Sequence, residues 1–292
     1  MQNKNKINYS SNANIWGAKK VGYVFLITIL FFNISVLAQE KWNLNASFEY
    51  AGSHNVNGAY NNLFYLAGGV KYTSGKYSID VILPIVAQNG GMYTQLGMMV
   101  LRDSGLNHPD STLNQGHIKG SVVDGETITN LAAGFGDLLL IGNFKLVSEK
   151  RNLPTIFAES FIKIPTASKT TQISTGKIDF GLSFNIQKTI LGIIGSAKVG
   201  YWFLRNPDAH TIKNPVAVAL SIGKKIKKDK YAIFLMYEGY SKIVANYSAP
   251  KELSVLLQYF ISSNTILSIK ASTGLSSSSP DFLFESKFDF NI

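Results

Sequence analysis

The sequence predicts an all-β fold, an antiparallel transmembrane β-barrel of about 12 strands preceded by a cleaved signal peptide. Three observations predict it. The final stretch, 281–292, alternates an aromatic face with a charged face, as a strand between lipid and a wet lumen does. After residue 40, no apolar run approaches the roughly 20 residues of a membrane helix, so any spanning segment there must be β. Finally, long and short connections alternate along the chain.

The composition excludes several classes of protein. The chain of 292 residues has no cysteine, which excludes disulfides, thiolate metal sites and cysteine nucleophiles. The formal net charge is +10, but four lysines precede residue 39 and no basic domain or nucleic-acid motif follows. We therefore expect no nucleic-acid partner.

The N-terminal region has the features of a secretory signal peptide. Residues 21–38 are apolar, follow two lysines and end in small residues before Gln39. The sequence therefore predicts a signal peptide over 1–38, cleaved after Ala38, and a barrel domain over 39–292. The alternative is an uncleaved helical anchor, although the apolar run is short for that and is interrupted by polar residues.

Two-residue alternation predicts the strands in order. The first strand mirrors the last, with Trp42, Leu44 and Phe48 alternating with polar residues. Pro84 is expected near the end of the third strand, where an irregular rim tolerates a residue without an amide hydrogen. The twelve expected strands are 42–50, 62–73, 76–87, 136–147, 154–165, 176–188, 192–204, 214–224, 230–240, 252–262, 265–274 and 281–292.

The connections assign the two ends of the barrel. With both termini in the periplasm, the short turns face the periplasm and the long loops face outward. The longest irregular stretch is 88–132, part of which, Met92–Leu101, either extends a strand or folds inward as a plug. A soluble secreted β-sandwich is the main alternative fold, and it does not explain this asymmetry. Aromatic residues near strand ends suggest interfacial girdles: Tyr65, Tyr72, Tyr77, Phe144, Phe157, Tyr201, Phe203, Tyr231, Tyr237 and Tyr259.

Three short motifs point to a family. They are Gly134-Phe135-Gly136-Asp137, a strand end over 162–166 that contains a lysine, a proline and a threonine, and a strand over 175–182 that contains glycines and an aspartate. Together they resemble the outer-membrane barrel family named for the MetA pathway of phenol degradation. The resemblance implies an outer-membrane location and uptake of small, often aromatic or hydrophobic, compounds. The structural interpretation is that the glycines bend the rim and Pro165 ends a strand. A dinucleotide fingerprint is excluded because no third glycine follows and the segment opens a strand.

The inner face is expected to carry charged and apolar residues together. The charges either form ion pairs across the lumen or line a passage, and the apolar members suit a small-molecule site. The inner face is predicted to include Lys71, Glu252 and Asp289, and the apolar Ile82, Met236 and Leu256. The predicted solute pathway consists of Glu49, Asp80, Glu159, Phe161, Lys163, Asp179, Lys198, Trp202, Phe234, Glu238, Phe260, Lys270, Glu285 and Lys287.

No catalytic residue, metal or cofactor is predicted. The four histidines, His54, His108, His117 and His210, fall in expected loops, and none is followed two residues later by the serine of a barrel phospholipase. His108, Asp110 and His117 match no standard metal spacing. A barrel hydrolase is thus a lesser alternative to a channel, and a structural or adhesion barrel is another. The expected partners are outer-membrane lipid, the barrel-assembly machinery and an unidentified small solute. The lysine-rich run 224–230 is either a solvated periplasmic turn or touches anionic headgroups.

Overall fold

The fold was analysed in a computed structural model. It describes residues 40–54, 60–89, 93–102, 131–168, 173–206, 211–245 and 247–292. The expected signal peptide, and the expected loop histidines His108, His117 and His210, lie outside the described residues. Within the described part, no helix is long and apolar enough to cross a membrane.

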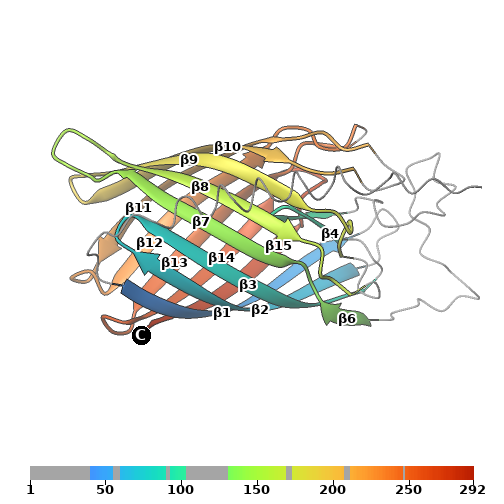
Figure 1. The fold of residues 1–292 in the computed structure, drawn as a ribbon, viewed down its shortest axis with the longest axis horizontal. Helices are drawn as coiled ribbons and strands as arrows, with labels where there is room; N and C mark the ends of the chain where they lie inside the picture. The colour runs from blue at the N-terminus through green and yellow to red at the C-terminus, as the bar shows by residue number, and fades with distance from the viewer. Residues whose placement is uncertain are drawn as a thin grey trace, which may run out of the picture. The chain divides into compact units, whose positions relative to one another are not determined.

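The described residues contain fifteen strands (Figure 1). They are β1 (Glu40–His54), β2 (Tyr60–Ser74), β3 (Tyr77–Asn89), β4 (Tyr93–Leu96), β5 (Met99–Arg102), β6 (Leu131–Phe135), β7 (Leu138–Val147), β8 (Thr155–Ile164), β9 (Asp179–Ile190), β10 (Ile193–Phe203), β11 (Val216–Ile226), β12 (Tyr231–Tyr240), β13 (Lys251–Phe260), β14 (Thr265–Gly274) and β15 (Phe282–Asn291).

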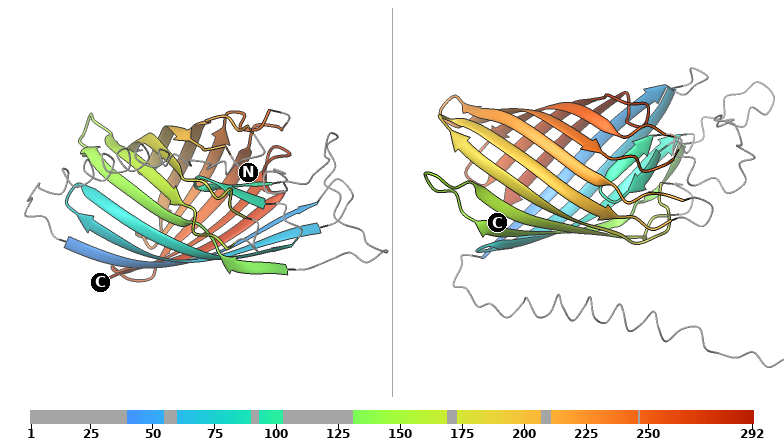
Figure 2. Two further views of the ribbon diagram at one scale, coloured as in Figure 1. Left: turned by 45° about the vertical axis from the view of Figure 1, so that its right-hand side comes forward. Right: turned by 90° about the horizontal axis from the view of Figure 1, so that it is seen from above.

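Thirteen of these strands form one antiparallel sheet that closes on itself. Strands adjacent in sequence pair from β1 to β3 and again from β7 to β15, β3 also pairs with β7, and β1 pairs with β15. β6 and β7 follow one another along β3, so they share one place in the ring, which has twelve places. The strands are tilted together around the barrel (Figures 1 and 2). The predicted barrel and its strand number are confirmed.

The connections sort by length between the two ends. The turns after β2, β7, β9, β11 and β13 are short and lie at the end where the chain finishes (Figure 1). Most connections at the other end are longer, although the β1–β2 connection, 55–59, is short, and the connection from β3 to β6 includes the separate hairpin β4–β5. We call the first end periplasmic and the second extracellular, as the expected topology requires.

The long stretch 88–132 departs from the prediction of an irregular loop. β3 continues to Asn89, β4 and β5 form a hairpin, and β6 begins at Leu131. The expected loop 51–61 is also shorter, since β1 runs to His54 and β2 begins at Tyr60. Loop composition hid these strands because glycine, asparagine and serine also occur at the wet ends of barrel strands.

A proline explains the interruption between β6 and β7. Pro84 lies within β3, five residues before its end, not at the rim as predicted. Its carbonyl accepts a hydrogen bond from the Gly136 amide at 2.9 Å, but its own nitrogen carries no hydrogen to return to that strand. A side chain at Gly136 would also contact the Pro84 ring at 2.8 Å. The ladder therefore breaks here, and Asp137 turns into the lumen.

The outer face is apolar all the way round the ring. Leu66, Leu83, Leu182, Leu220 and Leu253 are examples of large hydrophobic side chains that remain exposed on successive parts of the wall. A continuous exposed apolar surface on a closed barrel requires a membrane around it. Most of the predicted girdle aromatics face outward by register. Tyr65 and Phe157 do not, because they share the inner face of β2 and β8, where Tyr65 packs on a buried cluster.

Candidate functional site: a plugged lumen

The hairpin β4–β5 lies inside the extracellular end of the barrel, packed against inner-face residues. All four residues of β4 are buried, and Tyr93, Leu96 and Leu101 are almost inaccessible. The Tyr93 hydroxyl donates to Ser53 Oγ on β1 at 3.0 Å. This hydrogen bond joins the hairpin to the β1 part of the wall. Of the two sequence alternatives for Met92–Leu101, the inward fold is the one observed over the described part, 93–101.

The tip of the hairpin rests against an aromatic pair. Phe161 on β8 and Trp202 on β10 meet edge to face, with ring centroids 4.9 Å apart. Gly97, at the tip, has a left-handed φ of 57°, and an added Cβ there would lie 2.8 Å from the Phe161 ring. From the wall, Gly181 leaves the same rings room, because its Cβ would lie 2.2 Å from Phe161. Two glycines thus allow the rings to pack between wall and hairpin.

A buried ion triad lies beside the tip. Lys163 Nζ is 3.0 Å from Asp137 Oδ2 and 3.0 Å from Asp179 Oδ2, and all three side chains are 0% exposed. The triad also reaches the hairpin: Asp179 accepts from the Gly97 amide at 3.1 Å, and Lys163 donates to the Gln95 carbonyl at 3.5 Å. We call Asp137, Lys163 and Asp179 the latch, because they join three barrel segments to the hairpin.

Neutral groups complete the hydrogen bonding of the latch. Asp137 accepts from the Ser174 hydroxyl at 2.6 Å and from the Ala167 amide at 3.1 Å. Asp179 accepts from the Arg205 amide at 3.1 Å. Lys163 donates to Thr175 Oγ1 at 3.3 Å. One ammonium and two carboxylates are tolerated without water because these donors share the excess negative charge.

The three sequence motifs converge on this place. The first supplies Asp137, the second Lys163 and the third Asp179 and Gly181. Thr166, at the end of the second motif, accepts from the Leu138 amide at 2.9 Å and donates to the Gly136 carbonyl at 3.1 Å. The hydroxyl therefore bridges the interruption between β6 and β7. The structural interpretation is correct for Pro165, which directly follows the end of β8 at Ile164. It is wrong for Gly136, because the break there lies beside Pro84 within the wall and not at the rim, and it missed the latch.

A second anchor holds the other end of the hairpin. Arg102, the last residue of β5, forms an ion pair with Asp281 and donates to the His54 carbonyl. Partial burial disfavours the charged form of Asp281, but the hydrogen bonds from His54 and the charge of Arg102 outweigh it and lower the pKa of this carboxyl. His54 Nδ1 lies 3.1 Å from Asp281 Oδ2. The anchor is partly exposed at the extracellular rim, whereas the latch is dry.

The wall opposite the latch is acidic. Glu49 lies opposite Glu285 in the β1–β15 register, and Glu238 lies opposite Glu252 in the β12–β13 register. Lys270, between these pairs on β14, forms an ion pair with Glu285 at 2.7 Å. These four carboxylates and one ammonium therefore form an acidic strip on the inner surface of β12 to β1.

The other predicted pathway residues also lie on the inner face by register. Lys198 pairs with Glu159 at 3.1 Å, and Lys287 pairs with Asp289 at 3.1 Å. Asp80 accepts from Asn45 at 3.2 Å. Nearer the periplasmic end, Phe260 lies under the Lys225 ammonium, 5.5 Å from the ring centroid, and Phe234 packs over Gly223. Their place on the inner wall is thus established, whereas their role in carrying a solute stays a prediction.

Sequence reasoning missed the residues that hold the hairpin against the wall. The sequence marks Asp137 only as part of a motif, and it places Gln95, Gly97 and Arg102 in a loop. A signal existed for Asp137, because an aspartate directly after Gly-x-Gly on a strand that should be apolar needs a partner. No local signal marks Arg102, because its partner Asp281 is 179 residues away.

These features define a class of protein: a membrane-spanning β-barrel of the outer-membrane type, with a hairpin packed inside it. The family described as "Putative MetA-pathway of phenol degradation" matches residues 50–292, and the chain belongs to this family. The resemblance suggested by the three motifs is confirmed. Among curated proteins, none matches.

Three solved structures of outer-membrane barrels are similar to this chain to different degrees. An outer membrane channel from Pseudomonas putida F1 is similar with a TM-score of 0.60 and 10% identity, covering 89% of this chain and 98% of that one. The KdgM porin in complex with disordered oligogalacturonate gives 0.46 and 6%, covering 85% and 98%. The CymD monoaromatic hydrocarbon channel gives 0.42 and 9%, covering 88% of each chain. At 10% identity the likeness to the Pseudomonas putida channel shows the fold alone.

Proposed function

We propose that the protein is an outer-membrane channel for small hydrophobic or amphipathic solutes, and that the hairpin β4–β5 is its gate. The observation that carries the proposal is the mixed character of the lumen around the hairpin. Leu96, Met99 and Leu101 pack with Phe161 and Trp202 in one apolar cluster, and the acidic strip lies on the opposite wall. Apolar surface with a few fixed polar groups is the usual composition of a small-molecule site, whereas a general porin has a polar lumen.

The contacts of the hairpin support a gate. Its anchors to the wall are of two kinds, a buried latch at the tip and a partly exposed ion pair at the rim. A solute that competes for the aromatic pair would displace the tip, and the latch would then become hydrated. The family is described by the degradation of phenol, an aromatic compound, so we propose uncharged aromatic molecules as the first class to test.

The alternatives weighed from the sequence receive less support. A hydrolase would need a nucleophile beside a base. The described histidine, His54, contacts Asp281 and the ring of Tyr60, an arrangement that anchors the hairpin. A purely structural or adhesion barrel would not need a buried apolar cluster inside its lumen. Lipid and the barrel-assembly machinery, which would engage β15, remain proposed partners.

Solute binding can be followed through Trp202. In the barrel domain the other tryptophan is Trp42, which lies on the outer face, so a Trp42→Phe variant isolates the lumen signal. We expect 2-phenylethanol to change the emission of Trp202 saturably in detergent, and mannitol to have no effect. Planar-bilayer current blocked by 2-phenylethanol would provide the transport readout. The absence of both the emission change and the block would contradict the proposal.

A further inference from the structure

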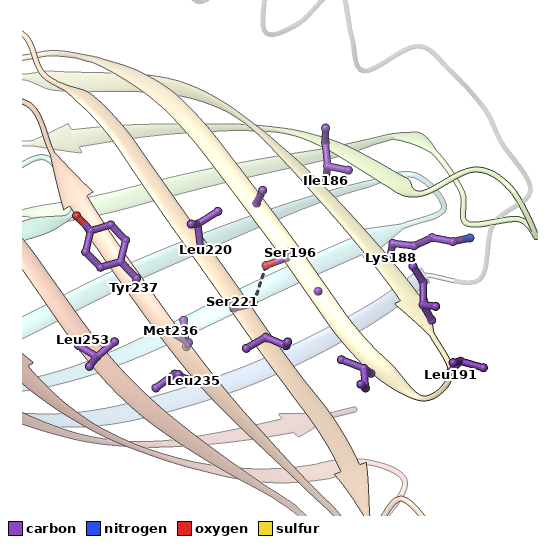
Figure 3. A pocket seen from close by; sticks show the side chains of 15 residues that line it. Ile186, Lys188, Leu191, Ser196, Leu220, Ser221, Leu235, Met236, Tyr237 and Leu253 are labelled. Carbon is purple, nitrogen blue, oxygen red and sulfur yellow. Dashed lines mark hydrogen bonds between the residues drawn. The ribbon is translucent and has the colours of Figure 1, made fainter.

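The outer wall of the barrel carries an apolar groove of about 690 Å³ near the periplasmic end (Figure 3). Its floor is β10, where Gly195 and Ala197 face outward. Ile186 on β9 and Ile222 on β11 belong to the walls, and Leu253 on β13 lies at the end remote from the β9–β10 turn. The volume falls within the roughly 300–1,000 Å³ of typical ligand sites. The groove is therefore large enough for a hydrocarbon chain.

The groove exists because the residues on its floor are small. Gly195 lies between Lys188 on β9 and Ile222 on β11 in the strand register. A Cβ built at Gly195 would meet nothing within 4 Å. The flanking side chains are long and exposed, at 47% for Ile186 and 55% for Ile222. In a bilayer this space must be filled by hydrocarbon, because neither water nor protein is present to fill it.

The periplasmic mouth of the groove is strongly basic. Lys188 belongs to the lining of the groove, and Lys224 lies opposite Ile193, another lining residue, on the same outer face. The adjoining turns add more cations, and together seven positive side chains accompany only Glu149 and Asp229. The seven are Lys150, Arg151, Lys188, Lys224, Lys227, Lys228 and Lys230.

The charge is concentrated on this side of the barrel. The β13–β14 turn, 261–264, has no charged residue, and the β2–β3 turn has one, Lys76. A solvated rim with no partner would not need its cations gathered below one groove. Lys188 donates to the carbonyls of Lys150, Arg151 and Leu153, which fixes the β7–β8 turn beside the mouth.

Aromatic rings hold two of the lysines at the headgroup level. Tyr231 and Tyr259 stack with centroids 5.0 Å apart. The ammonium of Lys227 lies 5.4 Å from the Tyr231 centroid, and that of Lys230 lies 5.5 Å from the Tyr259 centroid. Tyrosine at a bilayer interface beside a cation places that cation where lipid phosphates lie.

The turn that carries these lysines is strained. Lys227, Lys228 and Asp229 all have left-handed backbones, with φ of 50°, 55° and 65°. Left-handed backbone is unfavourable for residues with a Cβ, and three in succession without glycine are costly. Asparagine or glycine would form this turn more easily, so the turn holds its two lysines at a cost in backbone energy.

We propose that the groove and its basic mouth bind one anionic phospholipid of the periplasmic leaflet, of the phosphatidylglycerol class. An acyl chain lies over Gly195 and Ala197, and the phosphate lies among Lys224, Lys227 and Lys230. The positive charge of the mouth favours an anionic lipid over a second copy of the chain as the occupant. A two-fold contact between two copies would bring two basic mouths together, and these would repel each other. The site is independent of what crosses the lumen.

Native mass spectrometry of the delipidated full barrel tests the site. The probes are phosphatidylglycerol and phosphatidylcholine with identical acyl chains. We expect phosphatidylglycerol to bind at least about tenfold more tightly, since each lysine near an anionic surface contributes a severalfold gain. The combined variant Lys224→Gln, Lys227→Gln, Lys228→Gln and Lys230→Gln should lose that preference. Gly195→Leu should weaken the binding of both lipids by blocking the floor.

Matched controls separate the site from general surface effects. Gly68→Leu adds a leucine to the outer face of β2, where a Cβ also meets nothing within 4 Å, and Lys213→Gln with Lys242→Gln removes exposed cations from the extracellular end. Both should bind as the unchanged protein does. Heat-modifiable migration on gels confirms that each variant is a folded barrel. Equal binding of the two lipids, unchanged binding in the lysine variant, or a dimer that Gly195→Leu abolishes would each overturn the proposal.

Discussion

Two lysines on the inner wall meet carboxylates at about the same distance but in different surroundings. Lys163, at the extracellular end of β8, is 0% exposed together with both of its aspartates, whereas Lys198, in the middle of β10, is 33% exposed and its partner Glu159 19%. The dry triad has the hairpin above it, and the wet pair does not. The difference indicates that the hairpin, more than the barrel, makes the latch a buried site. Removing the lysine charge should therefore lower the stability of the protein much more at Lys163 than at Lys198.

The largest effect is expected from Lys163→Met. It leaves two carboxylates buried without a counter-charge, which costs about 3–5 kcal/mol in buried pairs. The carboxylates regain water if the hairpin leaves, so we expect the variant to release it. Urea unfolding in detergent and single-channel current in planar bilayers measure the two effects. Lys198→Met should change stability by at most about 1 kcal/mol, and an equal loss in both variants would show that hairpin burial is not what matters.

Neutralising the whole latch sharpens the comparison. Lys163→Met combined with Asp137→Asn and Asp179→Asn removes the charges together, and a buried ion group replaced in this way is often close to neutral in stability. We expect the triple variant to recover most of the stability lost by Lys163→Met. If it is as unstable as the single variant, hydrogen-bond geometry and not unpaired charge determines the latch.

The aromatic contact predicts a smaller effect. Gly181→Ala places a methyl group 2.2 Å from the Phe161 ring, and overpacking of this kind costs about 1–3 kcal/mol. We expect partial displacement of the hairpin tip, seen as higher current and a red-shifted Trp202 emission. Gly68→Ala, on the outer face with open space around it, is the control. Unchanged emission in Gly181→Ala would mean that the rings do not pack as described.

The rim anchor should respond to acid. The pKa of Asp281 is lowered in the folded protein, so the stabilisation from its ionised form is complete above the ordinary aspartate pKa of about 4 and is lost as the pH falls through the lowered value. We expect acidification below about pH 4 to loosen the Arg102 end of the hairpin, and Asp281→Asn to cause the same increase in current at neutral pH. Current in Asp281→Asn that still rises with acid would assign the effect to other groups.

Most of the barrel could be predicted from the sequence, but few of the contacts of the proposed gate could. Two-residue alternation placed twelve strands because each repeats one local rule, lipid outside and polar inside. The position of Pro84 inside a strand and the break between β6 and β7 were not predicted. A proline indicates a strand end unless the neighbouring strand is known. The latch depends on which ends of β6, β8 and β9 meet in space. Lys163 and Asp179 were correctly placed on the inner face, but their contact with the hairpin could not be deduced from periodicity.

The central claim is that the hairpin β4–β5 closes the lumen and that the latch holds the hairpin in this position. Gln95 and Ser174 are paired in a parallel bridge between the hairpin and the β8–β9 connection. Since the chain has no native cysteine, Gln95→Cys with Ser174→Cys offers a reversible cross-link. The decisive measurement is the planar-bilayer current of this pair combined with Lys163→Met. The account predicts a low current in the oxidised protein and a severalfold higher current after dithiothreitol. The same current in both states would contradict it.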